Sequence, residues 1–150
     1  MKLILPKKIS WLILIFFFTF DAVVSYIAVT RMHGIEADLM IAFAVEKYPP
    51  LYFVTIPGLI IIMYFIALGL TKLAMKFFNK KRLKREIIEQ IILTALVIYW
   101  SVANSYMNLS FILGHRLTIP GWYKLSLLGF VLAIIYFAYT VSRFKVANRK

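Results

Sequence analysis

Four long apolar stretches alternate with shorter polar stretches along the 150-residue chain. The apolar stretches cover about residues 11–30, 51–71, 88–113 and 122–141. Each is long enough for an α-helix to cross the ~30 Å hydrocarbon core of a bilayer, which takes about 20 residues. Because lipid offers the backbone no hydrogen-bond partners, helices are the expected structure of such stretches. The pattern predicts an all-α polytopic membrane protein, with four transmembrane helices forming a single bundle over residues 1–150.

Shorter stretches fill the gaps between the predicted spans. Prolines precede the second and fourth spans, where the first turn of a helix has no partner for a backbone N–H. Residues 37–47 are too short to cross a bilayer, and their apolar side chains favour a helix that lies in the interface. Residues 72–87 are strongly basic, and we expect them to form a cytoplasmic loop, into which the second span continues as a helix that turns near Asn79.

The composition supports the membrane class. Hydrophobic residues make up 63% of the chain and charged residues 16%, whereas a soluble domain has about half and about a quarter. The absence of cysteine excludes disulfides and thiolate chemistry. The first residues look like a signal peptide, but the apolar run continues past Asp21 and no small-residue cleavage site closes it. We therefore expect an uncleaved first helix.

The net charge of +12 comes from 18 basic and 6 acidic side chains. With the N-terminus in the cytoplasm, fourteen basic residues flank the spans on the cytoplasmic side and four on the outer side. This asymmetry predicts N-in/C-in topology, as a multi-pass protein of the cell membrane. The basic segments are expected to meet anionic headgroups rather than nucleic acid. The sequence is compatible with assembly into a larger membrane complex or into a homo-oligomer.

One acidic residue interrupts the first apolar stretch, at Asp21 in "FFFTFDAVVSYIAV". An aspartate near the centre of a helix opposes membrane insertion by about 3 kcal/mol. The twelve Leu, Ile, Val and Phe residues between positions 11 and 29 favour insertion by roughly 5 kcal/mol together. The helix should therefore still insert, with Asp21 facing the bundle or a wet cavity.

Polar residues elsewhere can reach the depth of Asp21. Ser25 lies one turn further along the first span, on the same helix face. The third span carries a polar stripe at helical spacing that includes Ser101, Asn104 and Asn108. At 1.5 Å per residue, Asp21 lies about 20 Å above Lys8 and Ser101 about 24 Å above Arg85. The two spans can therefore bring polar groups together near mid-membrane, whereas Trp100 lies too deep for the interfacial aromatic belt.

These polar residues have two interpretations. Serine and asparagine commonly hydrogen-bond between membrane helices, each contributing about 0.6–2 kcal/mol. Alternatively, they line a pocket in the outer half of the bundle that holds a cation, a proton or a polar headgroup. The candidate lining residues are Asp21, Ser25, Glu36, Ser101, Asn104 and Asn108.

The stretch "FDAVVSYIAVTRMHGIEADLM" resembles a motif of small, uncharacterised prokaryotic, often archaeal, multi-pass membrane proteins. In that family, Asp-x3-Thr in the first helix is followed by Gly-x-Glu-Ala-Asn-Pro-Leu-Met or a near equivalent. The matching positions here are Asp21, Ser25, Gly34, Glu36, Ala37, Leu39 and Met40. Asp38 stands where Asn is usual, and the following Pro is absent. The resemblance implies three or four helices and links Asp21 with Glu36, but it implies no activity.

Three classes of function follow from these observations. The preferred one is a non-enzymatic accessory or binding component with a polar pocket in the outer half of the bundle. The alternatives are a small proton- or cation-coupled transporter that uses Asp21, and an intramembrane metal-dependent enzyme. The enzyme would have Asp21, Glu36 and His33 at a lipid-facing metal site, with His33 and Glu36 as the candidate ligands. The sequence lacks a zinc-protease motif, a nucleophile elbow, a Walker loop and a dinucleotide fingerprint. No catalytic residue and no cofactor are therefore predicted.

Overall fold

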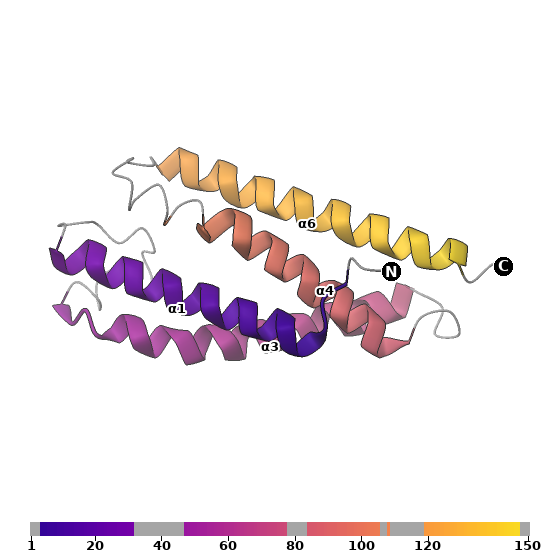
Figure 1. Ribbon diagram of the computed structural model, residues 1–150, viewed down its shortest axis with the longest axis horizontal. Helices are drawn as coiled ribbons and strands as arrows, with labels where there is room; N and C mark the ends of the chain where they lie inside the picture. The colour runs from indigo at the N-terminus through magenta and orange to yellow at the C-terminus, as the bar shows by residue number, and fades with distance from the viewer. Residues whose placement is uncertain (1–3, 32–46, 78–83, 106–107, 109–118, 148–150) are drawn as a thin grey trace.

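The protein is described by a computed structural model, which covers residues 4–31, 47–77, 84–105, 108 and 119–147. Its long helices are α1 (Lys7–Arg31), α3 (Leu51–Phe77), α4 (Arg85–Trp100) and α6 (Ile119–Ala147), and the π-helical segment η1 (Ser101–Ser105) continues α4. Consecutive long helices run in opposite directions along the molecule, and both termini lie at the same end (Figure 1). The prediction of an all-helical chain with four helices long and apolar enough to span a membrane is confirmed.

The helices extend beyond the apolar stretches from which they were predicted. α1 begins at Lys7 rather than near Trp11. The expected helical continuation of the second span past Thr71 is confirmed, since α3 reaches Phe77. Lysine is a good helix former, so a basic residue next to an apolar stretch does not end a helix. At 1.5 Å per residue, the 25 residues of α1 extend about 37 Å, which exceeds the ~30 Å of the hydrocarbon core.

The third predicted span does not continue as one regular α-helix. The α-helical hydrogen-bond pattern ends at Trp100, and the next five residues form the π-helical segment η1. A π-helical turn closes hydrogen bonds between residues i and i+5, and such turns in helical proteins are frequently found at functional sites. The predicted stretch 109–113 and the predicted interfacial helix, apart from Lys47, lie outside the described residues.

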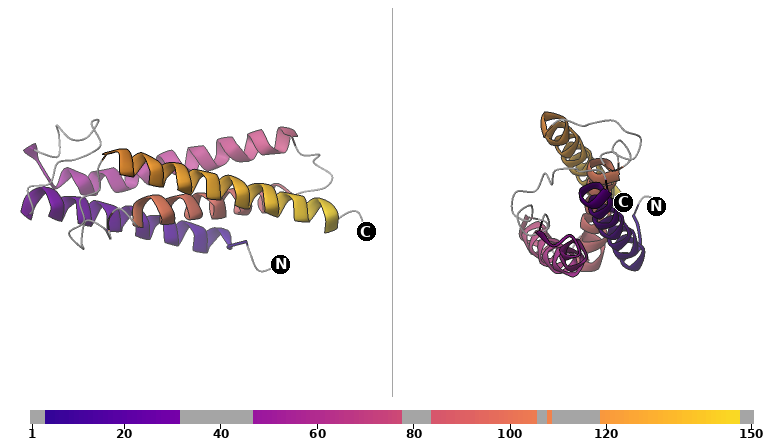
Figure 2. Two further views of the ribbon diagram at one scale, coloured as in Figure 1. Left: turned by 90° about the horizontal axis from the view of Figure 1, so that it is seen from above. Right: turned by 90° about the vertical axis from the view of Figure 1, so that its left-hand side faces the viewer.

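Helix α4 occupies the centre of the molecule. α1, α3 and α4 contact one another, whereas α6 packs mainly against α4 and η1. Figure 2 shows α6 and α3 on different sides of α4. The main core lies among the first three long helices, and its buried members are Leu14 and Phe18 of α1, Met63 and Ala67 of α3, and Leu93 and Val97 of α4. The fold is therefore a three-helix core with a fourth helix laid on its central member.

A glycine allows α6 to approach α4 closely. A Cβ added at Gly129 would lie 3.0 Å from the backbone oxygen of Tyr99 and 3.5 Å from the Cβ of Val102. Small residues at helix interfaces let backbones come close together, which is a common basis of helix association in membranes. Gly129 therefore sets the distance between α6 and the junction of α4 with η1.

Large apolar side chains cover much of the outer surface. Leu12 and Phe65 are each 66% exposed, and Phe130 of α6 is 55% exposed. A soluble monomer rarely exposes contiguous apolar surface on this scale. Such a surface suits contact with lipid tails, in agreement with four helices of membrane-spanning length and composition.

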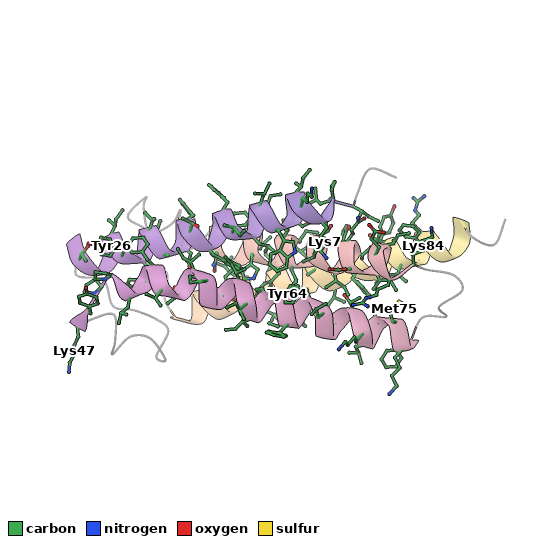
Figure 3. The ribbon with its side chains drawn as sticks, turned by 90° about the horizontal axis from the view of Figure 1, so that it is seen from below. Lys7, Tyr26, Lys47, Tyr64, Met75 and Lys84 are labelled. Atoms are coloured by element: carbon green, nitrogen blue, oxygen red, sulfur yellow. The ribbon has the colours of Figure 1, made fainter. Side chains whose placement is uncertain are left out.

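The end of the molecule that carries the termini is the more basic one. In the described residues, its Lys and Arg residues are Lys7, Lys8, Lys72, Lys76, Lys84, Arg85, Arg143 and Lys145. The opposite end carries Arg31, Lys47 and Lys124. Figure 3 shows Lys84 towards the basic end and Lys47 at the other end, where Tyr26 also lies. The charge asymmetry that the sequence predicts for the whole chain is thus also present in the helices.

The N-terminal segment is attached to α4 at the basic end. The backbone N–H of Leu5 donates a 3.1 Å hydrogen bond to the Oγ1 of Thr94, whose own hydroxyl donates to the carbonyl of Gln90. Helix α4 begins with Arg85 and Glu86, one turn before Gln90. Glu89 of α4 forms an ion pair with Lys7 of α1. These contacts fix the depth of α1 relative to α4, and therefore the depth of every side chain that faces across their interface.

Candidate functional site

The described part of the chain brings Asp21 together with one member of the polar stripe. The Nδ2 of Asn108 donates a 2.8 Å hydrogen bond to the Oδ1 of Asp21. Asp21 is half-buried in α1, and Asn108, which follows η1, is only 7% exposed. The hydrogen bond joins two helical segments that are 87 residues apart in sequence.

The packing of α1 explains why Asp21 faces inward. Phe18 and Ala22, which flank Asp21 on the same helix, are both buried. Asp21 lies about 20 Å from Lys8 and about 15 Å from Arg31, measured along the axis of α1. The carboxyl group is therefore placed far from both charged ends of the helix, in the middle of an apolar stretch of α1.

The other predicted pocket residues have different surroundings. Ser25 is half-buried, one turn beyond Asp21. Ser101 donates its hydroxyl proton to the carbonyl of Ile98 at 2.9 Å, so its own helix supplies an acceptor. Asn104 is 7% exposed within η1, and its Nδ2 has no hydrogen-bond partner among the described residues. The structure therefore joins Asp21 with Asn108, and Asn104 is a buried donor one turn before Asn108 in the chain.

The two predicted metal ligands, Glu36 and His33, lie outside the described residues. Within the described ranges, no group of three or more His, Cys, Asp or Glu side chains could hold a metal ion. The observed chemistry of the site thus consists of one carboxyl group, two amides and the side chains packed around them.

Sequence reasoning did not include Trp100 in the site. Its ring packs edge-on against Phe18, with 5.0 Å between the ring centroids. The indole Nε1 is buried and, like the amide of Asn104, lacks a hydrogen-bond partner in the part of the chain that the structure describes. Two signals pointed to it: the depth of Trp100, which is too great for an interfacial belt, and its position four residues before Asn104.

The arrangement provides hydrogen-bond donors next to a single acid. Trp100, Asn104 and Asn108 follow one another at four-residue spacing and carry N–H groups, while Asp21 carries the carboxyl group. A buried polar group that lacks a partner costs about 1–3 kcal/mol. This set of groups can therefore bind a polar atom. It does not include a serine or cysteine held against a base, which nucleophilic catalysis requires.

Comparison with protein-family models, with curated proteins and with solved structures gives no match. The resemblance of the first half of the chain to small prokaryotic membrane proteins therefore remains an expectation based on its motif. The helices define the class: an all-helical protein with four helices suited to a membrane. The hydrogen-bonded pair of Asp21 on α1 and Asn108 after η1 distinguishes this protein from a purely apolar bundle.

Proposed function

We propose that this chain is a small multi-pass protein of the cell membrane that serves as a non-enzymatic accessory or binding component. Its polar site in the outer half of the bundle binds a polar group of a ligand or of a partner subunit. The observation that carries the proposal is the hydrogen bond from Asn108 to Asp21, which sits among apolar helices.

The energetics favour binding over helix packing alone as the role of Asp21. An aspartate at mid-span opposes insertion by about 3 kcal/mol. One hydrogen bond between membrane helices contributes only about 0.6–2 kcal/mol. An asparagine at position 21 could accept the same hydrogen bond from Asn108 without a carboxyl group. The acid is therefore better explained by something that it binds.

The proposed orientation places both termini in the cytoplasm. Basic residues concentrate at the end where the chain starts and finishes, and positively charged flanks remain on the cytoplasmic side of membrane proteins. The same residues, exemplified by the exposed Lys72 and Lys76, lie where anionic headgroups would meet them. In this orientation, Asp21 and Asn108 lie closer to the outer face than the core residue Leu14 does.

Native mass spectrometry of the protein released from lipid nanodiscs tests the binding function. We expect the wild-type protein to carry a bound molecule at a ratio near one to one, and Asp21→Leu to lose it. Thr19→Val is the matched control, because the exposed hydroxyl of Thr19 donates only to the carbonyl of Ile15 in its own helix. A wild-type protein that carries nothing, or an Asp21→Leu protein that keeps the same molecule, would contradict the proposal.

A second candidate is proton- or cation-coupled transport. The observation that favours it is the position of Asp21, an ionisable residue within a span and only half-buried, because such residues commonly mark ion pathways. In proteoliposomes, this function predicts that Asp21→Asn abolishes ion-driven flux while circular dichroism shows an intact fold. Flux that is unchanged in Asp21→Asn excludes it.

A further inference from the structure

Two buried N–H groups on the segment that precedes Asn108 have no acceptor among the described residues. The Nε1 of Trp100 and the Nδ2 of Asn104 are shielded from solvent and have no hydrogen-bond partner among the described residues. Asn104 as a whole is only 7% exposed. Each buried donor without an acceptor costs about 1–3 kcal/mol, and a hydrocarbon environment provides no water to relieve that cost. Two such groups one turn apart indicate that an acceptor binds between them.

Both donors lie on the side of α4 and η1 that faces α1. The ring of Trp100 packs against Phe18 of α1. Asn104 comes four residues later, which places it over Trp100 on the same face. The neighbouring Tyr99 instead meets Gly129 of α6, on another side of the helix. The two residues therefore share the side of the helix that is turned towards α1, the helix that carries Asp21.

Asn104 lies between two contacts that join α4 and the segment after it to α1. α1 and α4 run in the same direction (Figure 1). Trp100 packs against Phe18 of α1, and Asn108 donates its hydrogen bond to Asp21, three residues further along α1. Asn104 is four residues from Trp100 and four from Asn108, so it belongs to the stretch that follows α1 from Phe18 to Asp21.

The chemistry of these groups selects the kind of atom that fits between them. An N–H donor presents a partial positive charge, which disfavours a bare metal cation, while the acid disfavours an anion. A hydroxyl oxygen suits both the N–H donors and the acid, because it accepts two hydrogen bonds and donates at least one. Buried water in proteins makes about three such bonds. Trp100 and Asn104 would donate to the oxygen, and the oxygen would donate to Asp21.

We propose that Trp100, Asn104 and Asp21 form a binding site for a hydroxyl oxygen beside the π-helical segment. The oxygen belongs either to an internal water molecule or to the hydroxyl group of a lipid headgroup. The inference rests on the function proposed above, since it names the ligand chemistry of the same polar site. It also gives η1 a role, because the wider π-helical turn adds room at the level where the oxygen binds.

NMR spectroscopy of the indole N–H of Trp100 tests this site. The chain has three tryptophans, so a Trp11→Phe/Trp122→Phe protein, labelled with ¹⁵N-indole and held in lipid nanodiscs, gives one signal. We expect cross-relaxation from the Nε1–H to water if water occupies the site, and to the glycerol protons of the lipid if a headgroup hydroxyl does. An indole signal with neither cross-peak overturns the proposal, and this measurement requires no change within the site.

Variants then identify the residues that hold the oxygen. Asn104→Leu removes one of its donors, and we expect the cross-peak to be lost. Ser101→Ala is the matched control, because the hydroxyl of Ser101 donates to Ile98 of its own helix, and the cross-peak should persist. A cross-peak that is unchanged in a folded Asn104→Leu protein refutes the site as proposed.

The two proposals fail in different ways. If native mass spectrometry finds no bound molecule but the Trp100 cross-peak to water is present, the binding function is wrong and the water site stands. If a bound molecule depends on Asp21 but the indole of Trp100 contacts neither water nor a headgroup, the binding function stands and the hydroxyl site is wrong.

Discussion

The hydrogen bond between Asp21 and Asn108 predicts an unequal response to removing its two partners. Asn108→Leu takes one donor away from a carboxyl group that stays inside the bundle. Asp21→Leu removes the carboxyl group itself and leaves a neutral amide at position 108. The first change leaves the more costly group behind, so it should destabilise the fold more than the second change does.

The sizes of the effects follow from the groups involved. The hydrogen bond contributes about 0.6–2 kcal/mol, and taking a donor away from a buried polar group adds to the cost, so we expect Asn108→Leu to lower the free energy of unfolding by about 1–3 kcal/mol. For Asp21→Leu, the loss of the bond is offset by removal of a residue that opposes insertion by about 3 kcal/mol. The net change should therefore stay within about 1 kcal/mol. In a double-mutant cycle with both leucines, we expect a coupling of about 1–2 kcal/mol.

Reversible unfolding in mixed micelles, followed by circular dichroism, measures all four proteins of the cycle. The exchanged pair Asp21→Asn/Asn108→Asp is a fifth protein, in which the carboxyl group and the amide trade helices and can still bond to each other. Its stability should be close to that of the wild type. The reasoning is refuted if Asp21→Leu is the more destabilising single change, or if the coupling is below about 0.3 kcal/mol.

Three further predictions concern packing, anchoring and orientation. Gly129→Ala should destabilise the protein by about 1–3 kcal/mol, because its Cβ would press on a backbone oxygen, whereas Gly69→Ala, with nothing within 4 Å, should be neutral or stabilising by up to about 1 kcal/mol in the same unfolding assay. Thr94→Val removes the acceptor for the N–H of Leu5, so amide hydrogen exchange at Leu5 should accelerate; an unchanged rate would contradict that contact. Because the chain lacks native cysteine, Lys47→Cys in intact cells should react with an impermeant maleimide and Lys84→Cys only after permeabilisation, and the reverse pattern would invert the proposed topology.

Apolar length predicted most of the fold, because a stretch of lipid-compatible residues leaves the backbone no alternative to a helix. The start of α1 was less predictable, because Lys7 begins a helix that the apolar pattern alone would start near Trp11, whereas the continuation of α3 through Lys76 was expected from the mixed basic and apolar pattern of residues 72–85. The placement of α6 also could not be predicted. Its apolar residues lie all around the helix, so no polar face marks the solvent side, and Gly129 is the one local sign of its contact with α4.

Part of the candidate site could also be predicted, from depth alone. Counting residues from the basic flanks predicted similar depths for Asp21 and Ser101. The structure instead places Asn108 against the acid. Side chains on a helix point towards its N-terminus, so a residue further along the chain reaches back to a lower level. The π-helical segment between the two positions changes the spacing further, and no pattern of polar residues predicts such a turn.

The position of α6 has a consequence for how the protein is made. Every buried residue of the main core belongs to α1, α3 or α4, all of which precede α6 in the chain and leave the ribosome before it does. Chains fold from the N-terminus during synthesis, and membrane helices associate after they insert. The three-helix core can therefore assemble while α6 is still emerging, and α6 docks last, with Gly129 meeting a surface that is already formed.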